Sequence, residues 1–331
     1  MMATLKEIAE KTHVSITTVS RVLNNDKSLS VGAKIRQKIL DTARAMQYKT
    51  PRNRMRLKSS KELNVCIVHW YDIDQEMDDP YYMQIRMGIE KLAIESNINT
   101  DLVYKQKGHY IFNDVCYDGL ILVGKFSDEE IDLFKKRSNH LVFVDSSPRE
   151  NEFDSIVIDF KSSVEMILTE LIDRGYQSIG YLGGREVICD SISLGERREM
   201  VFKHFLNDKN LLDIRHIHVG EFSTESGYRL MIEALNEPMA EVYFCANDNI
   251  AIGAMRAIRE KGLNIPDDIG LVGFNDGTNS EFTFPPLSTL HVPTEDMGRQ
   301  ALASIVDLVE GRVIHIKKVL PTKLVTRASL K

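Results

Sequence analysis

The chain has 331 residues, of which 43% are hydrophobic, and it carries a formal net charge of −6. This length exceeds one ordinary domain and predicts two or three. The sequence holds no apolar run long enough for a membrane-spanning helix, and its four cysteines lack CxxC or Cys/His metal spacing, which favours reduced thiols over a metal site.

The charge is divided unevenly along the chain. Residues 1–61 hold fourteen Lys and Arg against four Asp and Glu, a net charge of +10, whereas the remaining 270 residues carry 28 against 44, a net charge of −16. A basic head on an acidic body suits a protein of which only the head contacts phosphate. A solvated basic face is the simpler explanation of a charge run, but the confinement of this one to the first fifth of the chain disfavours it.

Residues 4–24, TLKEIAEKTHVSITTVSRVLN, predict two short helices joined by a turn. Thr4 and Glu7 have the spacing of a capping box at the start of the first helix, and Ser15 is the expected N-cap of the second. In a helix-turn-helix, the start of the second helix reaches base edges in the major groove, although a plain packed hairpin gives the same pattern. The residues expected to face outward there are Ile16, Thr17, Ser20 and Arg21.

A third helix is expected to begin at an N-cap, Ser30, and to extend to about Met46. Residues 48–61, YKTPRNRMRLKSSK, then form a polar and basic connector, in which Pro51 marks the break from the helix. The side chains expected on one face of the third helix are Ile35, Ile39, Ala43 and Met46.

From Asn64 onward, short apolar runs alternate with helical patterns, which predicts parallel sheets covered by helices on both faces. The length of this part fits two halves of about 100 to 130 residues. The expected strands are 65–70, 118–124, 140–145, 178–184, 241–247 and 269–276, and the expected helices are 81–95, 161–174, 198–206, 226–235 and 249–261.

Polar residues stand where several of these strands end. Ligands of open α/β sheets bind beyond the carboxyl ends of the strands. A single polar residue in such a place is often only a turn former or a helix cap, but recurrence at several strand ends favours a binding site. The residues concerned are Asp145, Asn247, Asp248, Asn275 and Asp276.

Motifs of the common enzyme classes are missing from the sequence: it contains no G-x-x-x-x-G-K-[ST], no G-x-S-x-G, no H-E-x-x-H and no G-x-G-x-x-G after a strand. Gly180, Gly183 and Gly184 lack the spacing of a phosphate loop, and close packing of strand and helix explains them better. We therefore expect no catalytic centre, no metal and no cofactor.

TLKEIAEK followed by VSITTVSRVLN resembles the headpiece of the lactose-repressor (LacI/GalR) family of bacterial transcription regulators. Residues 245–276 and 282–290 are also typical of that family, so the resemblance covers essentially the whole chain. DDPYYMQIRMGIE (78–90) and the tail segment resemble the subgroup that represses galactoside-utilisation genes. The chain departs from the family at Thr12-His13, where Ala-Gly is usual, so His13 must adopt the φ that the turn requires.

The resemblance implies an all-α helix-turn-helix headpiece, residues 1–50, followed by an α/β core of the periplasmic-binding-protein type I architecture, residues 62–331. Between them, residues 51–61 are expected to fold into a hinge helix on operator DNA, with Leu57 wedged into the central minor-groove step. Arg54 stands where a small residue is usual. The core is expected to have two parallel-sheet lobes joined by three crossovers, at about 62–160 plus 292–321 and about 161–290 plus 322–331.

On the headpiece, we expect Arg21 to donate to guanine and the methyl groups of Ile16 and Thr17 to contact bases. Contacts to phosphate, which position the protein without specifying sequence, are expected from Thr18, Ser20 and Ser30.

In the core, the resemblance implies an effector pocket whose chemistry suits a sugar. Carboxylate and amide oxygens accept from ring hydroxyls, Arg198 donates as a planar fork, and Phe222 covers the apolar face of a pyranose. Arg197 is a rival for the role of Arg198. The implied pocket residues are Tyr81, Asp145, Arg198, Phe222, Asn247 and Asn275.

These features predict a homodimeric, sugar-responsive repressor that an inducer, galactose or a galactoside, releases from operator DNA. A corepressor mechanism, in which the ligand tightens DNA binding, stays open. A solute-binding protein of the same core fold is opposed by the basic headpiece and by the lack of an apolar signal segment, which also places the protein in the cytoplasm. The chain ends at VTRASLK without a leucine heptad tail, so a dimer is expected and not a tetramer.

Overall fold

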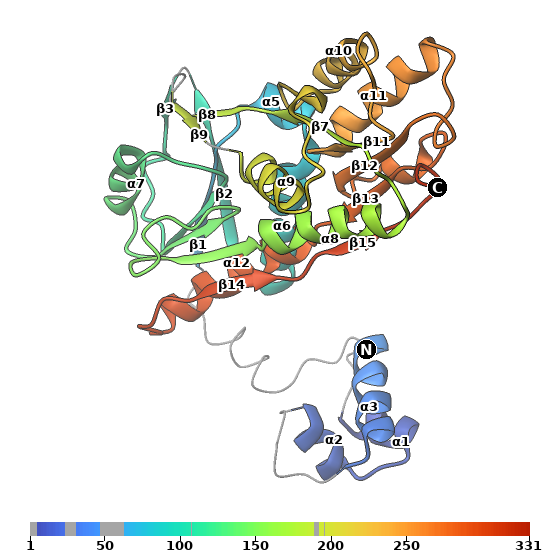
Figure 1. Ribbon diagram of the computed structural model, residues 1–331. Coiled ribbons are helices and arrows are strands. Elements are labelled where there is room, and N and C mark those ends of the chain that lie inside the picture. Colours follow the sequence, from blue (N-terminus) through green and yellow to red (C-terminus); the bar gives the residue numbers. More distant parts are fainter. Residues whose placement is uncertain (1–4, 24–30, 47–62, 107, 189–191, 195) are drawn as a thin grey trace. The chain divides into compact units, whose positions relative to one another are not determined.

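The computed structural model describes residues 5–23, 31–46, 63–106, 108–188, 192–194 and 196–331. The chain divides into two compact units, Met1–Glu62 and Leu63–Lys331 (Figure 1). The described residues do not include Thr4, Ser30 or the connector 48–61, which contains Leu57. No helix of the described part is long and apolar enough to cross a membrane.

The first unit contains three helices, α1 (Leu5–Thr12), α2 (Ile16–Leu23) and α3 (Ala33–Ala45). The Ser15 hydroxyl accepts from the backbone N–H of Thr18 at 3.1 Å, which confirms the predicted cap of α2. His13 has a φ of 60°, the left-handed value that a glycine would supply at the turn. The helices share a small apolar core of Ile8, Ala9, Val19, Val22, Ile39 and Ala43.

Ile35 is 45% exposed, although it shares a face of α3 with the buried Ile39 and Ala43. Ile35 lies in the first turn of α3, one turn before the buried Ile39. The small core formed with α1 and α2 reaches Ile39 and Ala43 but does not extend to this end of the helix.

The first lobe of the second unit is built on a seven-stranded sheet in the order β14-β6-β5-β4-β1-β2-β3. All neighbours are parallel except β2 and β3. Its strands are β1 (Asn64–His69), β2 (Asn99–Gln106), β3 (His109–Tyr110), β4 (Gly119–Val123), β5 (Leu141–Val144), β6 (Asp154–Ile158) and β14 (Lys317–Leu320), and its helices are α5 (Ile73–Asp78), α6 (Pro80–Ser96), α7 (Asp128–Lys135) and α12 (Thr294–Val309).

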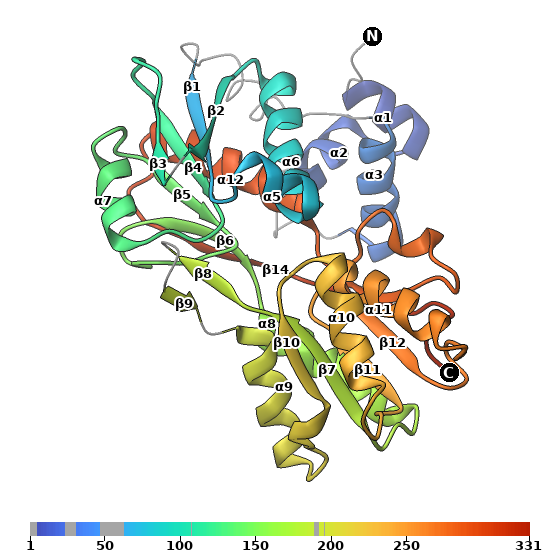
Figure 2. The same cartoon turned by 90° about the horizontal axis from the view of Figure 1, so that it is seen from above.

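The second lobe is built on a six-stranded sheet in the order β10-β7-β11-β12-β13-β15, in which only β13 and β15 pair antiparallel. Figure 2 shows β10, β7, β11 and β12 of this sheet side by side. Its strands are β7 (Ile179–Gly184), β10 (Ile217–Gly220), β11 (Val242–Cys245), β12 (Gly270–Asn275), β13 (Ser288–His291) and β15 (Lys323–Val325). Its helices are α8 (Phe160–Asp173), α9 (Arg197–Asp208), α10 (Thr224–Ala234) and α11 (Asp248–Glu260), with short 3-10 turns η1 (Ile214–His216) and η2 (Ser280–Phe282) and a hairpin of β8 (Glu186–Ile188) and β9 (Ile192–Leu194).

The chain passes between the two sheets three times: at Asp159 between β6 and α8, at 292–293 between β13 and α12, and at 321–322 between β14 and β15. One continuous apolar cluster extends through both lobes. All six predicted strands and all five predicted helices are present, each within two residues of its predicted ends.

In each lobe, two helices touch backbone to backbone through glycine. A Cβ on Gly88 of α6 would lie 2.1 Å from the carbonyl oxygen of Glu295 in α12, and one on Gly298 would lie 2.0 Å from that of Ile85. In the second lobe, a Cβ on Gly253 of α11 would lie 1.9 Å from a carbonyl oxygen of α10. Such contacts leave no room for a side chain between the two helices, so we expect each pair to move as one unit.

The change Gly88→Ala should therefore destabilise the core, although alanine is the better helix former. We expect the free energy of unfolding to fall by about 1 to 3 kcal/mol, because α6 and α12 must separate to admit the methyl group. Urea unfolding measures the difference. Gly277→Ala is the matched control, since its Cβ would meet nothing closer than Asp248 Oδ2 at 3.5 Å. Equal stability of both variants would contradict the rigid contact.

Candidate functional site

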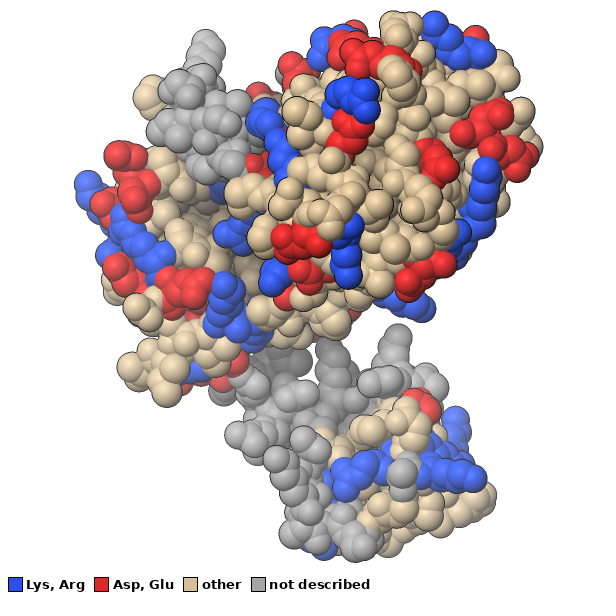
Figure 3. Space-filling model, in the orientation of Figure 1, with Lys and Arg blue, Asp and Glu red and all other residues tan. Residues whose placement is uncertain are grey.

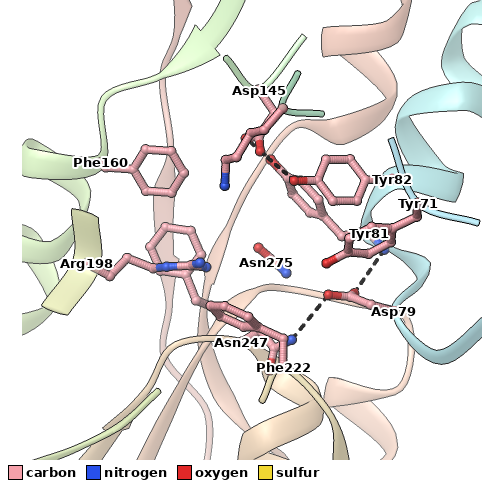
Figure 4. Close-up of a pocket in the computed structure, with 12 residues that line it drawn as sticks. Tyr71, Asp79, Tyr81, Tyr82, Asp145, Phe160, Arg198, Phe222, Asn247 and Asn275 are labelled. Carbon is pink, nitrogen blue, oxygen red and sulfur yellow. Dashed lines mark hydrogen bonds between the residues drawn. The ribbon is translucent and has the colours of Figure 1, made fainter. Parts of the chain in front are cut away.

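A pocket lies between the two lobes and takes residues from both (Figure 4). Figure 4 shows Tyr71, Asp79, Tyr81 and Tyr82 on one side, Phe160 and Arg198 on the other, and Asn275 between them. All six residues predicted for an effector pocket line it, namely Tyr81, Asp145, Arg198, Phe222, Asn247 and Asn275. Six further lining residues were not predicted from the sequence, namely Tyr71, Asp79, Tyr82, Lys125, Phe160 and Phe274.

Three polar residues of the pocket lie where strands end. Asp145 follows β5 directly and Asn275 is the last residue of β12, and their φ values are 69° and 108°. Positive φ is uncommon for residues other than glycine. Asn247 follows β11 and is the N-cap of α11, where its Oδ1 accepts from the backbone N–H of Ile250 at 2.9 Å.

Asp145 is buried, and both of its carboxylate oxygens are hydrogen-bonded. The hydroxyl of Tyr81 donates to Oδ1 and the hydroxyl of Tyr82 donates to Oδ2, each at 2.9 Å. Burial and the charge of Asp145 raise the pKa of Tyr81 well above its usual value, so this hydroxyl stays protonated and remains a donor.

Arg198 is held in a fixed orientation by hydrogen bonds and by aromatic rings. Its Nε donates to Glu196 Oε1 at 2.6 Å, and a terminal nitrogen donates to the carbonyl oxygen of Ala246 at 2.7 Å. Its guanidinium carbon lies 4.8 Å from the centroid of the Phe222 ring, 5.4 Å from that of Phe274 and 5.5 Å from that of Phe160. The rival residue, Arg197, is exposed on α9, so Arg198 is the arginine of this pocket.

Glu196 is the buried counter-ion of Arg198. Burial alone would raise the pKa of Glu196, but the charge of Arg198 and hydrogen bonds from Arg198, from the Tyr181 hydroxyl and from the backbone of Glu199 hold it below its usual value. The pair is therefore ionised at neutral pH, and no position in the sequence pattern pointed to Glu196.

A hydrogen bond between Asn247 and Asp79 joins the lobes across the pocket. Asn247 Nδ2 of the second lobe donates to Asp79 Oδ2 of the first at 3.3 Å. The other oxygen of Asp79 accepts from the backbone N–H of Tyr81 at 3.2 Å and caps α6. The first turn of α6 thus contacts both Asp145 of its own lobe and Asn247 of the opposite lobe.

Two of the strand-end residues, Asp248 and Asp276, do not line this pocket but support it. Asp248 accepts from the Thr289 hydroxyl at 2.5 Å and from the backbone N–H of Gly277 at 2.6 Å, and burial raises its pKa to about 7. Asp276 accepts from Arg327 at 2.8 Å. These bonds fix the turn that carries Asn275.

The headpiece residues predicted to contact DNA are partly accessible. Ile16 is 47% exposed and Thr17 is exposed, whereas Thr18, Ser20 and Arg21 are half-buried. Lys and Arg side chains gather on the described face of this unit (Figure 3). The core and the headpiece, as far as they are described, hold no group of three or more His, Cys, Asp or Glu side chains that could bind a metal.

Comparisons with known proteins match both units. Residues 4–51 match the model of the bacterial regulatory proteins of the lacI family, and residues 168–330 match that of the periplasmic binding protein-like domain. The chain is 35% identical over 345 residues to the HTH-type transcriptional repressor MelR of Bacillus subtilis (strain 168), which covers 99% of this chain and 97% of MelR. It is 36% identical over 347 residues to the HTH-type transcriptional regulator GalR of Streptococcus thermophilus, over the full length of both. Among solved structures, the lac repressor dimer bound to operator and the anti-inducer ONPF superposes with a TM-score of 0.69 at 24% identity, covering 100% of each chain.

The change Glu196→Gln should destabilise the core by about 3 to 5 kcal/mol at pH 7, because it leaves the buried charge of Arg198 without its partner. The pKa of Glu196 is lowered in the folded state, so its stabilising contribution is present above the unfolded pKa and is lost as pH falls through the folded value. Urea unfolding should therefore show a large difference in the free energy of unfolding between the variant and the wild type at pH 7. The difference should become smaller below about pH 4. Exposed Glu225→Gln is the control; a Glu196 variant that matched it at pH 7 would rule out the role of the pair.

Proposed function

The chain belongs to the lacI family of bacterial regulatory proteins, and from this membership we propose that it is a repressor whose interlobe pocket binds galactose or a galactoside and thereby releases operator DNA. The membership confirms the predicted family, the predicted fold class of a helix-turn-helix headpiece followed by an α/β core, and the regulation of transcription by DNA binding. The sugar, the direction of coupling and the residue roles are our proposal.

The observation that carries the proposed ligand is the mixture of groups around the interlobe pocket. Two carboxylates, two carboxamides, a guanidinium and the Lys125 ammonium line it, and the aromatic rings of Phe160 and Phe222 stand beside Arg198. A pyranose presents hydroxyls around its rim and apolar C–H groups on its faces, and these are the partners that such groups bind. Asp79, Tyr81 and Tyr82 of the pocket belong to residues 78–90, whose sequence resembles the galactoside subgroup.

The headpiece supplies the DNA contacts in this proposal. Arg21 donates to guanine, Ile16 and Thr17 place methyl groups against bases, and Leu57 is the minor-groove wedge of the connector. Thr18, Ser20 and Ser30 bind phosphate. Two copies of the chain form a dimer that reads the two half-sites of a pseudopalindrome, and the protein acts in the cytoplasm.

Sugar and operator binding are linked by a coupling free energy, typically about 1 to 3 kcal/mol, and the linkage is reciprocal. The direct test is fluorescence anisotropy on a labelled duplex from upstream of the protein's own and neighbouring genes, at fixed salt, with and without galactose, lactose, allolactose, glucose or a purine. We expect a galactoside alone to weaken binding about 5-fold to 150-fold. Tightening by any ligand would instead identify a corepressor mechanism, and no binding to any duplex would overturn the operator assignment.

The two proposed sites should be separable by mutation. Arg21→Ala should abolish specific operator binding, because it removes the base contact, and leave the affinity for sugar intact. Asp145→Ala should do the converse, since it removes the carboxylate that accepts ring hydroxyls. Anisotropy measures the first property and isothermal titration with sugar the second. Loss of both properties in either variant would count against separate sites.

A further inference from the structure

Both oxygens of the Asp145 carboxylate are hydrogen-bonded to hydroxyls of the protein itself. Tyr81 donates to Oδ1 and Tyr82 to Oδ2, both at 2.9 Å, and Asp145 is only 7% exposed. A carboxylate that recognises a sugar accepts hydroxyls at these same oxygens. Each tyrosine hydroxyl therefore takes one of the two acceptor positions on its oxygen. Because Asp145 is buried, a ligand hydroxyl has to compete for these positions.

The two tyrosines differ in how firmly they are held. Tyr82 is 3% exposed, and its ring packs against the rings of Tyr71, Trp70 and His69, with centroids 4.8 Å, 5.9 Å and 5.9 Å away. Tyr81 also lines the pocket, and its ring packs against that of Tyr82 at 4.9 Å between centroids. The Tyr82 ring thus contacts four rings, whereas among the described residues the Tyr81 ring contacts that of Tyr82, and the charges of Asp145, Arg198 and Asp79 act on its hydroxyl. Tyr82 is therefore held more firmly than Tyr81.

On the basis of the proposed sugar site, we infer that a ligand hydroxyl replaces the Tyr81 hydroxyl as the donor to Asp145 Oδ1. The Tyr82 hydroxyl keeps its hydrogen bond to Oδ2 and holds the carboxylate in place. Tyr81 is then an internal competitor of the effector. Tyr82 is a positioning residue, which acts on the ligand through Asp145.

The exchange also acts on α6. Tyr81 belongs to the first turn of this helix, which Asp79 caps and which Asn247 of the other lobe contacts through Asp79. Farther along, α6 is locked to α12 at Gly88 and Gly298. Release of Tyr81 from Asp145 therefore removes a bond between β5 and the α6–α12 pair without loosening the pair itself.

The test uses three conservative variants of the full-length protein, Tyr81→Phe, Tyr82→Phe and Tyr117→Phe, titrated with galactose and with lactose by calorimetry. Tyr117 is the matched control, because its hydroxyl donates to Asp101 Oδ2 at 2.7 Å in a buried place outside the pocket. Loss of the competing bond should raise the sugar affinity of Tyr81→Phe about ten-fold, the size expected for one hydrogen bond to a charged group. Tyr82→Phe should lower the affinity about ten-fold, and Tyr117→Phe should leave it unchanged.

The opposite signs at two neighbouring tyrosines separate this exchange from a general loosening of the pocket, which would shift both variants in the same direction. If both variants changed the sugar affinity in the same direction, or if Tyr81→Phe bound sugar no more tightly than the wild type, the exchange would be overturned while the sugar site would stand. A wild-type protein that binds neither sugar would overturn the proposed ligand, and this inference with it. As a second readout, operator release by the sugar should occur at about ten-fold lower concentration in Tyr81→Phe.

Discussion

The interlobe pocket depends on a backbone constraint at the ends of two strands. Asp145 and Asn275 each adopt a positive φ directly at the carboxyl end of β5 and β12, where an L-residue is strained unless its surroundings hold it. The surroundings do hold it: two tyrosine hydroxyls fix the side chain of Asp145, and the bonds of Asp248 and Asp276 fix the turn after Asn275. The left-handed turn places each side chain beyond its sheet, where the edges of both lobes meet.

The glycine contacts decide which parts of the core are able to move. With α6 locked to α12 and α10 locked to α11, a ligand has little scope to deform either lobe internally. The three crossovers remain as the places where the lobes turn against each other. One of them leads directly into α12, whose first residue, Thr294, donates from its hydroxyl to Gln84 of α6 at 2.9 Å. A change at the first turn of α6 therefore reaches a crossover within one rigid pair of helices.

The sequence predicted those elements whose signal is local. Buried parallel strands such as β4 and β5 read as continuous apolar runs, and helices such as α11 carry a clear apolar stripe. The edge strand β14 alternates exposed and half-buried residues within a polar stretch, and α7 is an acidic helix of eight residues, so neither was predicted. In the pocket, the positions of polar residues at strand ends predicted Asp145, Asn247 and Asn275. The role of Tyr82 arises from its contact with Asp145, 63 positions away in the chain, and that of Glu196 from its contact with Arg198, 2 positions away. Neither contact has a sequence pattern of its own.

The division of charge determines where sugar binding must act. The headpiece and connector carry a net charge of +10 and the rest of the chain −16, so phosphate is attracted to the first 61 residues and repelled by the core. The core therefore adds little direct attraction for DNA that a ligand could remove. A ligand shifts an equilibrium only by its difference in affinity for two states, and the contacts that can distinguish two lobe arrangements are those that span the pocket, such as Asn247 to Asp79. In our proposal, the free energy of sugar binding passes from these few contacts through the crossovers to two basic headpieces, so the pocket and the headpiece can be coupled without sharing a residue.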